Sequence, residues 1–227
     1  MPQSRRLVSS LAGLVAVGLA ATSASAQDQG SGPGEGPVFA PADILRWETE
    51  AFVDETAYRL DTVAGRPAVR ADCDASASGL YWRKPVDLTK TPILEWSWRV
   101  EAVPDPAASE RTKAGDDYVA RLYVIHDGGL LPWRTRAVNY VWAAGEPVGA
   151  DWPNAYAGQA HMVAVASGPP ATPGVWVTQR RDVRADFRRF HDLDLETIDA
   201  VALMTDCDDR GDTARAWFGT VRFQGDR

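Results

Sequence analysis

Residues 115–124, GDDYVARLYV, contain the clearest structural signal in this chain. Two adjacent aspartates lead into a largely apolar segment, Tyr118 to Ile125, in which successive side chains of a strand would point to opposite faces of a sheet. Both faces are apolar except at Arg121, so we expect a central strand. Residues 94–100, LEWSWRV, place apolar and polar side chains in strict alternation. That alternation predicts a strand over residues 93–100 with one side in the core.

Short apolar runs separated by turn residues recur along the rest of the chain. Helical spacing occurs only in residues 41–50 and 183–192. About ten short strands with so few helices predict an all-β protein, an antiparallel two-sheet β-sandwich of the jelly-roll type. The further predicted strands are residues 58–63, 68–72, 79–82, 137–142, 161–166, 175–180, 200–205 and 214–223.

The first 26 residues have the pattern of a signal peptide. Arg5 and Arg6 precede an apolar run from Leu7 to Ala21, and Ala24-Ser25-Ala26 is a small-residue cleavage signal. The apolar run is too short to cross a bilayer of about 30 Å comfortably. We therefore expect cleavage near Ala26 and a periplasmic or secreted protein without a membrane anchor, exported by the general or the twin-arginine route.

The remaining chain divides into a leader and one domain. Residues 27–38 are rich in glycine and lack apolar periodicity, which predicts a disordered leader. Residues 39–227 have the length of a single β-sandwich domain. Loss of Arg5 and Arg6 takes the formal net charge from −7 to −9, and so acidic a protein is not expected to bind nucleic acid. The sequence indicates no oligomeric state.

Cys73 and Cys207 are the only cysteines. Because disulfides persist in exported proteins, one bridge between them is expected, with two buried free thiols as the alternative.

Polar and aromatic residues near strand ends are the candidates for binding a ligand. Asp117 and Arg121 flank the start of the central strand, where the alternative is a buried ion pair. Adjacent aspartates on opposite faces do not offer the separated carboxyls of a glycosidase. Tryptophans in polar loops can stack on sugar rings, although burial under a loop is the alternative. The remaining candidates are Asn139, Asn154, Tyr156, Trp133, Trp142 and Trp152.

Residues 206–211, DCDDRG, contain part of a calcium-binding pattern. Arg210 and Trp217 occupy two positions that an EF-hand fills with ligands, so an EF-hand is excluded. A looser calcium site at Asp206, Asp208 and Asp209 and an acidic turn without a metal are the two interpretations. No other cofactor is expected.

Five motifs in order resemble the exported bacterial proteins classed as domain of unknown function 3047: DASASGL (74–80), LEWSWRV, GDDYVARLYV, NYVW (139–142) and MTDCDDRG (204–211). The resemblance covers roughly residues 52–223 and implies no established activity. The strand pattern is also similar to galactose-binding-like jelly rolls, which include many carbohydrate-binding modules. Cys207 departs from the family, which usually has a small or hydroxyl residue there.

We expect from these observations a protein that binds a carbohydrate or cell-envelope glycan without catalysis. The sequence lacks a P-loop, a dinucleotide fingerprint, an H-E-x-x-H motif and a nucleophile elbow. A glycan hydrolase or lyase using Asp116 or Asp117 with Arg121 or His161 is the first alternative. A structural or protein-binding envelope component is the second.

Overall fold

The computed structural model describes residues 34–105, 108–170, 172 and 174–226. The predicted signal peptide and most of the predicted leader lie outside these residues. No helix in the described part of the chain is long and apolar enough to span a bilayer.

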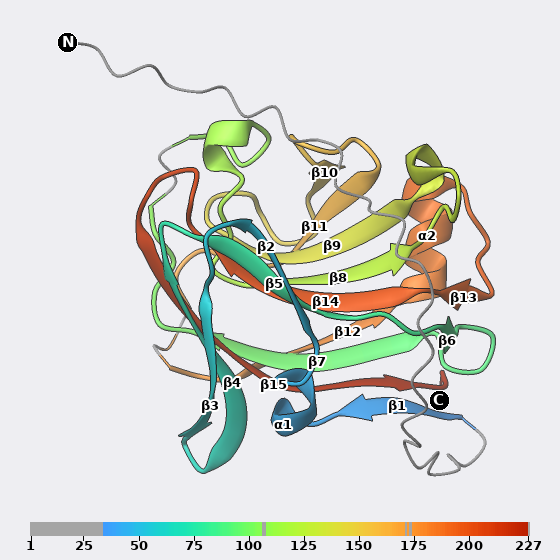
Figure 1. The fold of residues 1–227 in the computed structure, drawn as a ribbon, viewed down its shortest axis with the longest axis horizontal. Coiled ribbons are helices and arrows are strands. Elements are labelled where there is room, and N and C mark those ends of the chain that lie inside the picture. The colour runs from blue at the N-terminus through green and yellow to red at the C-terminus, as the bar shows by residue number, and fades with distance from the viewer. Residues whose placement is uncertain (1–33, 106–107, 171, 173, 227) are drawn as a thin grey trace. The chain divides into compact units, whose positions relative to one another are not determined.

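Two β-sheets form the two layers of a sandwich (Figure 1). The six-stranded sheet has the order β12 (Val177–Asp182), β7 (Ile93–Val100), β15 (Thr213–Gln224), β4 (Arg66–Asp74) and β3 (Ala57–Val63), with β1 (Glu35–Phe39) also paired to β15. The seven-stranded sheet has the order β10 (Asp151–Pro153), β11 (Ala160–Ser167), β9 (Arg136–Ala143), β8 (Arg121–His126), β14 (Ala200–Asp206), β5 (Ala77–Trp82) and β2 (Glu48–Val53).

Short elements connect and cover the sheets. A two-stranded ladder pairs β6 (Val86–Asp87) with β13 (Thr197–Ile198). The helices are α1 (Pro41–Ile44) and α2 (Val183–His191), and the 3-10 turns are η1 (Lys113–Gly115) and η2 (Pro132–Arg134).

The predicted all-β two-sheet sandwich is confirmed, and β8 is the middle strand of its sheet as expected. Pairing is antiparallel except between β9 and β11, because the chain turns back through β10 before it reaches β11.

Aromatic side chains fill the space between the sheets. Trp96 and Trp98 of β7 meet edge to face with ring centroids 5.3 Å apart, and Trp96 also contacts Tyr140 of β9. Trp98 contacts Trp142 across the same space. These contacts join the inner faces of the two sheets, as the alternation in residues 94–100 predicts.

The structure corrects three boundaries. Residues 35–38, predicted as leader, belong to β1 because they pair with the last strand of the chain. The helical pattern predicted for residues 41–50 ends after one turn, since β2 pairs with β5 from residue 48 onward. Strand β8 begins at Arg121 rather than Tyr118 because a side chain binds the preceding backbone: Tyr118 N–H donates to Asp206 (3.1 Å).

The predicted disulfide is present. Cys73 at the end of β4 bonds to Cys207 just after β14, with the two Cα atoms 6.3 Å apart. The bond ties the end of strand β4 in one sheet to the turn that follows β14 in the other.

Candidate functional site

The start of β8 and the end of β14 lie at the same end of the seven-stranded sheet. The two strands are antiparallel neighbours, with Met204 opposite Arg121. The aspartates before β8 therefore meet those after β14. We call the resulting group the acidic cluster; its residues are Asp116, Asp117, Asp206, Asp208 and Asp209.

Arg121 neutralises the buried part of this cluster. Its side chain is buried, and Nε donates to Oδ1 of Asp206 at 2.8 Å. A second nitrogen contacts Asp206 and the carbonyl oxygen of Asp116. The other terminal nitrogen, Nη1, lies 3.5 Å from Oδ2 of the Asp116 carboxylate. The sequence indicated an ion pair of Arg121 with a neighbouring aspartate, and the structure places Asp206 in closest contact.

The two adjacent aspartates have separate partners. Asp116 accepts from Nδ2 of Asn154 at 2.9 Å. Asp117 accepts from the backbone N–H groups of Asp209 (3.1 Å) and Arg210 (2.9 Å), and from Nε of Arg210 (3.2 Å). Asp117 therefore holds the turn after β14 in place, and its buried carboxylate faces no solvent.

Three members of the cluster carry oxygens suited to a cation. Asp117, Asp208 and Asp209 each offer a carboxylate oxygen, and these oxygens lie within 4.8 Å of one another. Asp206, which the sequence suggested as a ligand, is not in this group because Arg121 occupies it. Such oxygens are the ligand type that calcium prefers.

Burial and neighbouring charges perturb the outer carboxyls. Partial burial, followed by the charges of Asp208, Asp117 and Asp116, raises the pKa of Asp209 to about 6. Burial, and then the charge of Asp117, also raises the pKa of Asp208. The hydroxyl of Tyr156 donates to Asp209, which partly offsets this effect.

The loop between β10 and β11 brings two predicted residues to the cluster. Asn154 contacts Asp116, and Tyr156 contacts Asp209. Tyr156 is 40% exposed, and the ammonium of Lys113 lies 4.8 Å from the centroid of its ring. Both residues therefore adjoin the acidic cluster.

Asn139 lies deeper, on β9. Its Nδ2 contacts Met162 Sδ (3.2 Å), and its Oδ1 is buried without a hydrogen-bond partner among the described residues.

The three candidate tryptophans are not brought together. Trp142 is buried and donates from Nε1 to Gly168 O (2.9 Å). Trp152 is buried beneath Arg111. Apolar neighbours and a loop cover both rings, which corresponds to the burial alternative that the sequence left open. Trp133 is 63% exposed, but it follows the far end of β8 from the acidic cluster.

Sequence reasoning missed Arg210 and Glu110. Arg210 departs from the EF-hand pattern, and an arginine within an acidic turn is itself a signal for an ion pair. Glu110 accepts the backbone N–H groups of residues 144–146 at 2.8–2.9 Å. Nothing in the sequence links these distant segments.

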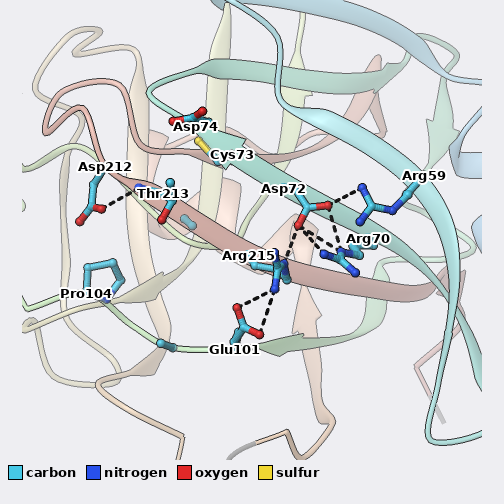
Figure 2. Close-up of a pocket in the computed structure, with 12 residues that line it drawn as sticks. Arg59, Arg70, Asp72, Cys73, Asp74, Glu101, Pro104, Asp212, Thr213 and Arg215 are labelled. Atoms are coloured by element: carbon cyan, nitrogen blue, oxygen red, sulfur yellow. Dashed lines mark hydrogen bonds and ion pairs between the residues drawn. The ribbon is translucent and has the colours of Figure 1, made fainter.

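A groove of about 650 Å³ lies on the outer face of the six-stranded sheet (Figure 2). At its centre Asp72 forms an ion pair with Arg59 (2.6 Å) and accepts hydrogen bonds from Arg70 (2.9 Å) and Arg215 (2.5 Å). Arg215 also binds Glu101. These opposite charges are paired with one another, and no pattern in the sequence indicates the groove.

Several solved structures of carbohydrate-binding or carbohydrate-cleaving proteins are similar to this chain. A family 11 carbohydrate-binding module from Clostridium thermocellum, in complex with a β-1,3-1,4-mixed-linked tetrasaccharide, is 11% identical, with a TM-score of 0.45 over 86% of this chain and 98% of that one. The family 30 module of a cellulosomal cellulase from the same organism is 11% identical, with a TM-score of 0.42 over 86% and 94%. The glycoside hydrolase domain of Endo-D from Streptococcus pneumoniae R6 is 10% identical, with a TM-score of 0.40 over 80% of this chain, which spans 22% of that one. Likeness at this level carries no information about ligand or activity.

No curated protein sequence matches this chain. The model of one protein family, described as "Protein of unknown function (DUF3047)", matches residues 45–222. The matched range contains all five motifs on which the resemblance rested. The chain therefore belongs to the DUF3047 family.

Proposed function

We propose that this protein binds a glycan at the outer side of the acidic cluster and does not cleave it. The observation that carries the proposal is the convergence of Asp208, Asp209 and Tyr156 at one partly exposed place, from two segments about fifty residues apart in the sequence. Carboxylates accept hydrogen bonds from sugar hydroxyls, and an aromatic ring packs against the apolar face of a sugar.

The surrounding residues hold this surface in a fixed shape. Asp117 binds the backbone of residues 209 and 210, and the disulfide at Cys207 anchors the same turn. Asn154 joins the loop of Tyr156 to Asp116. A binding site that is preorganised in this way loses less conformational entropy when its ligand binds.

Non-catalytic binding fits the geometry better than hydrolysis. A glycosidase needs two available carboxyls about 5–9.5 Å apart on either side of the scissile bond. Asp117 is buried and already accepts three hydrogen bonds. The carboxylate oxygens of Asp117, Asp208 and Asp209 lie within 4.8 Å of one another, which is closer than the separation that a glycosidase needs.

A glycan hydrolase or lyase is the second candidate because of one observation. The pKa of about 6 at Asp209 is of the kind found in general acids. A purely structural or protein-binding role in the envelope is the outcome expected if no glycan binds.

The predicted export would place the site among envelope glycans. The disulfide between Cys73 and Cys207 agrees with an oxidising compartment such as the periplasm.

A glycan array followed by calorimetry tests the proposal. The wild-type protein is compared with Tyr156→Ala and Asp209→Asn, and Trp133→Ala serves as the matched control because Trp133 is exposed but distant. We expect both cluster variants to weaken binding about tenfold or more, by analogy with the loss of one stacking or charged contact, while Trp133→Ala binds normally. Calcium and EDTA are added in turn, because the three oxygens are of the type that binds calcium.

The results separate the three roles. Absence of binding to every glycan, or binding that all three variants leave unchanged, contradicts the proposal. Release of reducing ends that disappears in Asp209→Asn would favour the hydrolase, and unsaturated products would favour the lyase.

A further inference from the structure

Strand β3 forms one edge of the six-stranded sheet. Among the described residues it pairs only with β4. Its seven residues, AYRLDTV, contain no proline, lysine or bulge. Natural proteins commonly use such features to prevent a sheet edge from pairing with another chain. The free edge of β3 is therefore open to a further strand.

The middle of β3 exposes an apolar side chain. Leu60 lies opposite Val69 of β4, which is fully buried, so it continues the inner, apolar face of the sheet. Leu60 itself is 53% exposed because β3 is the last strand. A strand added beyond β3 would cover it.

The sequence of β3 is complementary to itself in the antiparallel direction. A two-fold axis at Leu60 places Leu60 opposite Leu60 of a second copy. It also places Arg59 opposite Asp61, and Tyr58 opposite Thr62, on both sides of the axis. Opposite charges directly across an antiparallel pair stabilise it, and apolar pairs do the same.

The charged side chains of β3 lie along its own sheet. Arg59 contacts Asp72 of β4 through Nη1 (Figure 2). Asp61 accepts from Nε1 of Trp217 at 2.9 Å. The guanidinium has further N–H donors, so Arg59 can keep Asp72 while it binds a second carboxylate.

The other edges suit this pairing less well. Strand β2 carries Glu48 and Glu50 and no basic residue, so two copies would bring acidic groups together. Strand β10 has three residues and ends in Pro153, and β12 carries adjacent arginines at 180 and 181 and leads directly into α2.

We propose that two copies of this protein associate through antiparallel pairing of their β3 strands about Leu60, which joins two six-stranded sheets into one continuous sheet. The partner is a second copy because the order of charges in β3 matches its own reverse. The pairing is isologous and closes as a dimer, so it does not extend into a filament.

Sedimentation velocity over a concentration series tests the dimer. The wild-type chain is expected to show a monomer–dimer equilibrium. Leu60→Lys places two like charges face to face at the axis and is expected to weaken the dimer about tenfold or more. Leu130→Lys is the matched control, because Leu130 is 96% exposed in the loop after β8 and the substitution adds the same charge away from β3. It should leave association unchanged.

Charge exchange tests the register. Asp61→Arg and Arg59→Asp should each weaken the dimer, because each sets like charges opposite one another. The double variant should recover association relative to both single variants. Thermal melts of every variant monitor the fold.

Cross-linking supplies an independent readout. Leu60→Cys should form a disulfide-linked dimer under mild oxidation, because directly opposed residues have Cβ atoms about 4.5–5.5 Å apart. Leu130→Cys should cross-link far more slowly. The proposal is overturned if the chain remains monomeric up to about 1 mM. It is also overturned if Leu60→Lys does not weaken the dimer and Leu60→Cys does not cross-link it.

Discussion

Replacing Arg121 by methionine should destabilise the protein strongly. Arg121 contacts Asp206 and Asp116, and all three residues are at most 5% exposed. Removal of one partner from a buried ion pair costs about 3–5 kcal/mol, because the other charge stays buried without compensation. A single domain has a total unfolding free energy of only about 5–15 kcal/mol.

Urea unfolding followed by tryptophan fluorescence measures this loss. With an m value of about 2 kcal/mol/M, the midpoint should fall by about 2 M. The effect of Asp206→Asn on stability should change sign between two backgrounds. In the wild-type background this substitution removes the partner of Arg121 and should destabilise. In the Arg121→Met background it removes an orphaned charge and should restore about 1–3 kcal/mol.

Two results would refute this reasoning. One is a cost below about 1 kcal/mol for Arg121→Met, because a buried pair should cost several times more. The other is destabilisation by Asp206→Asn in both backgrounds, since that would mean Asp206 is stabilising without its cation. Arg121→Lys is the control for charge alone, as lysine cannot form the two parallel bonds that a guanidinium makes.

Three further predictions concern the same region. Replacing Cys73 and Cys207 by alanine opens a loop of 134 residues, for which chain entropy gives about 5 kcal/mol; we expect a loss of about 2–5 kcal/mol in urea, and no loss would contradict a structural bond. The pKa of Asp209 is raised to about 6, so its carboxyl binds a proton more tightly in the folded state than in the unfolded state. The protonated carboxyl therefore contributes stability that is complete below the ordinary pKa of 3.8 and is lost as the pH rises through about 6. Asp209→Asn should remove that part of the pH dependence in thermal melts, and an unchanged profile would show that the carboxyl titrates normally. Calcium should raise the melting temperature if the outer oxygens bind it, and Asp208→Asn should abolish the increase; identical melts in calcium and EDTA would contradict a calcium site.

Strands with strict alternation could be predicted closely from the sequence. The predicted strand of residues 93–100 coincides with β7, because its apolar face is entirely buried and a shift by one residue would expose the tryptophans. Strands β1, β2 and β10 could not be found this way. Each is an edge or peripheral strand, and its pairing with a neighbouring strand, rather than an alternating apolar pattern, determines it.

Site residues were harder to predict than strands. The turn at residues 206–211 and the start of β8 both carry recognisable motifs, but nothing in the sequence shows that they are neighbours. Their contact follows from the antiparallel pairing of β8 with β14, a relation between residues some eighty positions apart. For the same reason the sequence did not show which aspartate Arg121 would bind.

Burial divides the acidic residues into two groups with different consequences. Asp116, Asp117 and Asp206 are at most 7% exposed, and hydrogen bonds to Arg121, Asn154 and the 209–210 backbone occupy them. The GDDYVARLYV motif therefore contributes mainly a scaffold, and Asp117 is its one member of the three-oxygen group suited to a cation. The groups left open to a ligand come from the turn after β14 and the loop after β10. Loops tolerate substitution better than buried charge networks do. We therefore expect changes at Asp208, Asp209 or Tyr156 to alter ligand preference without unfolding the domain. Changes at Arg121 should instead destabilise the whole domain.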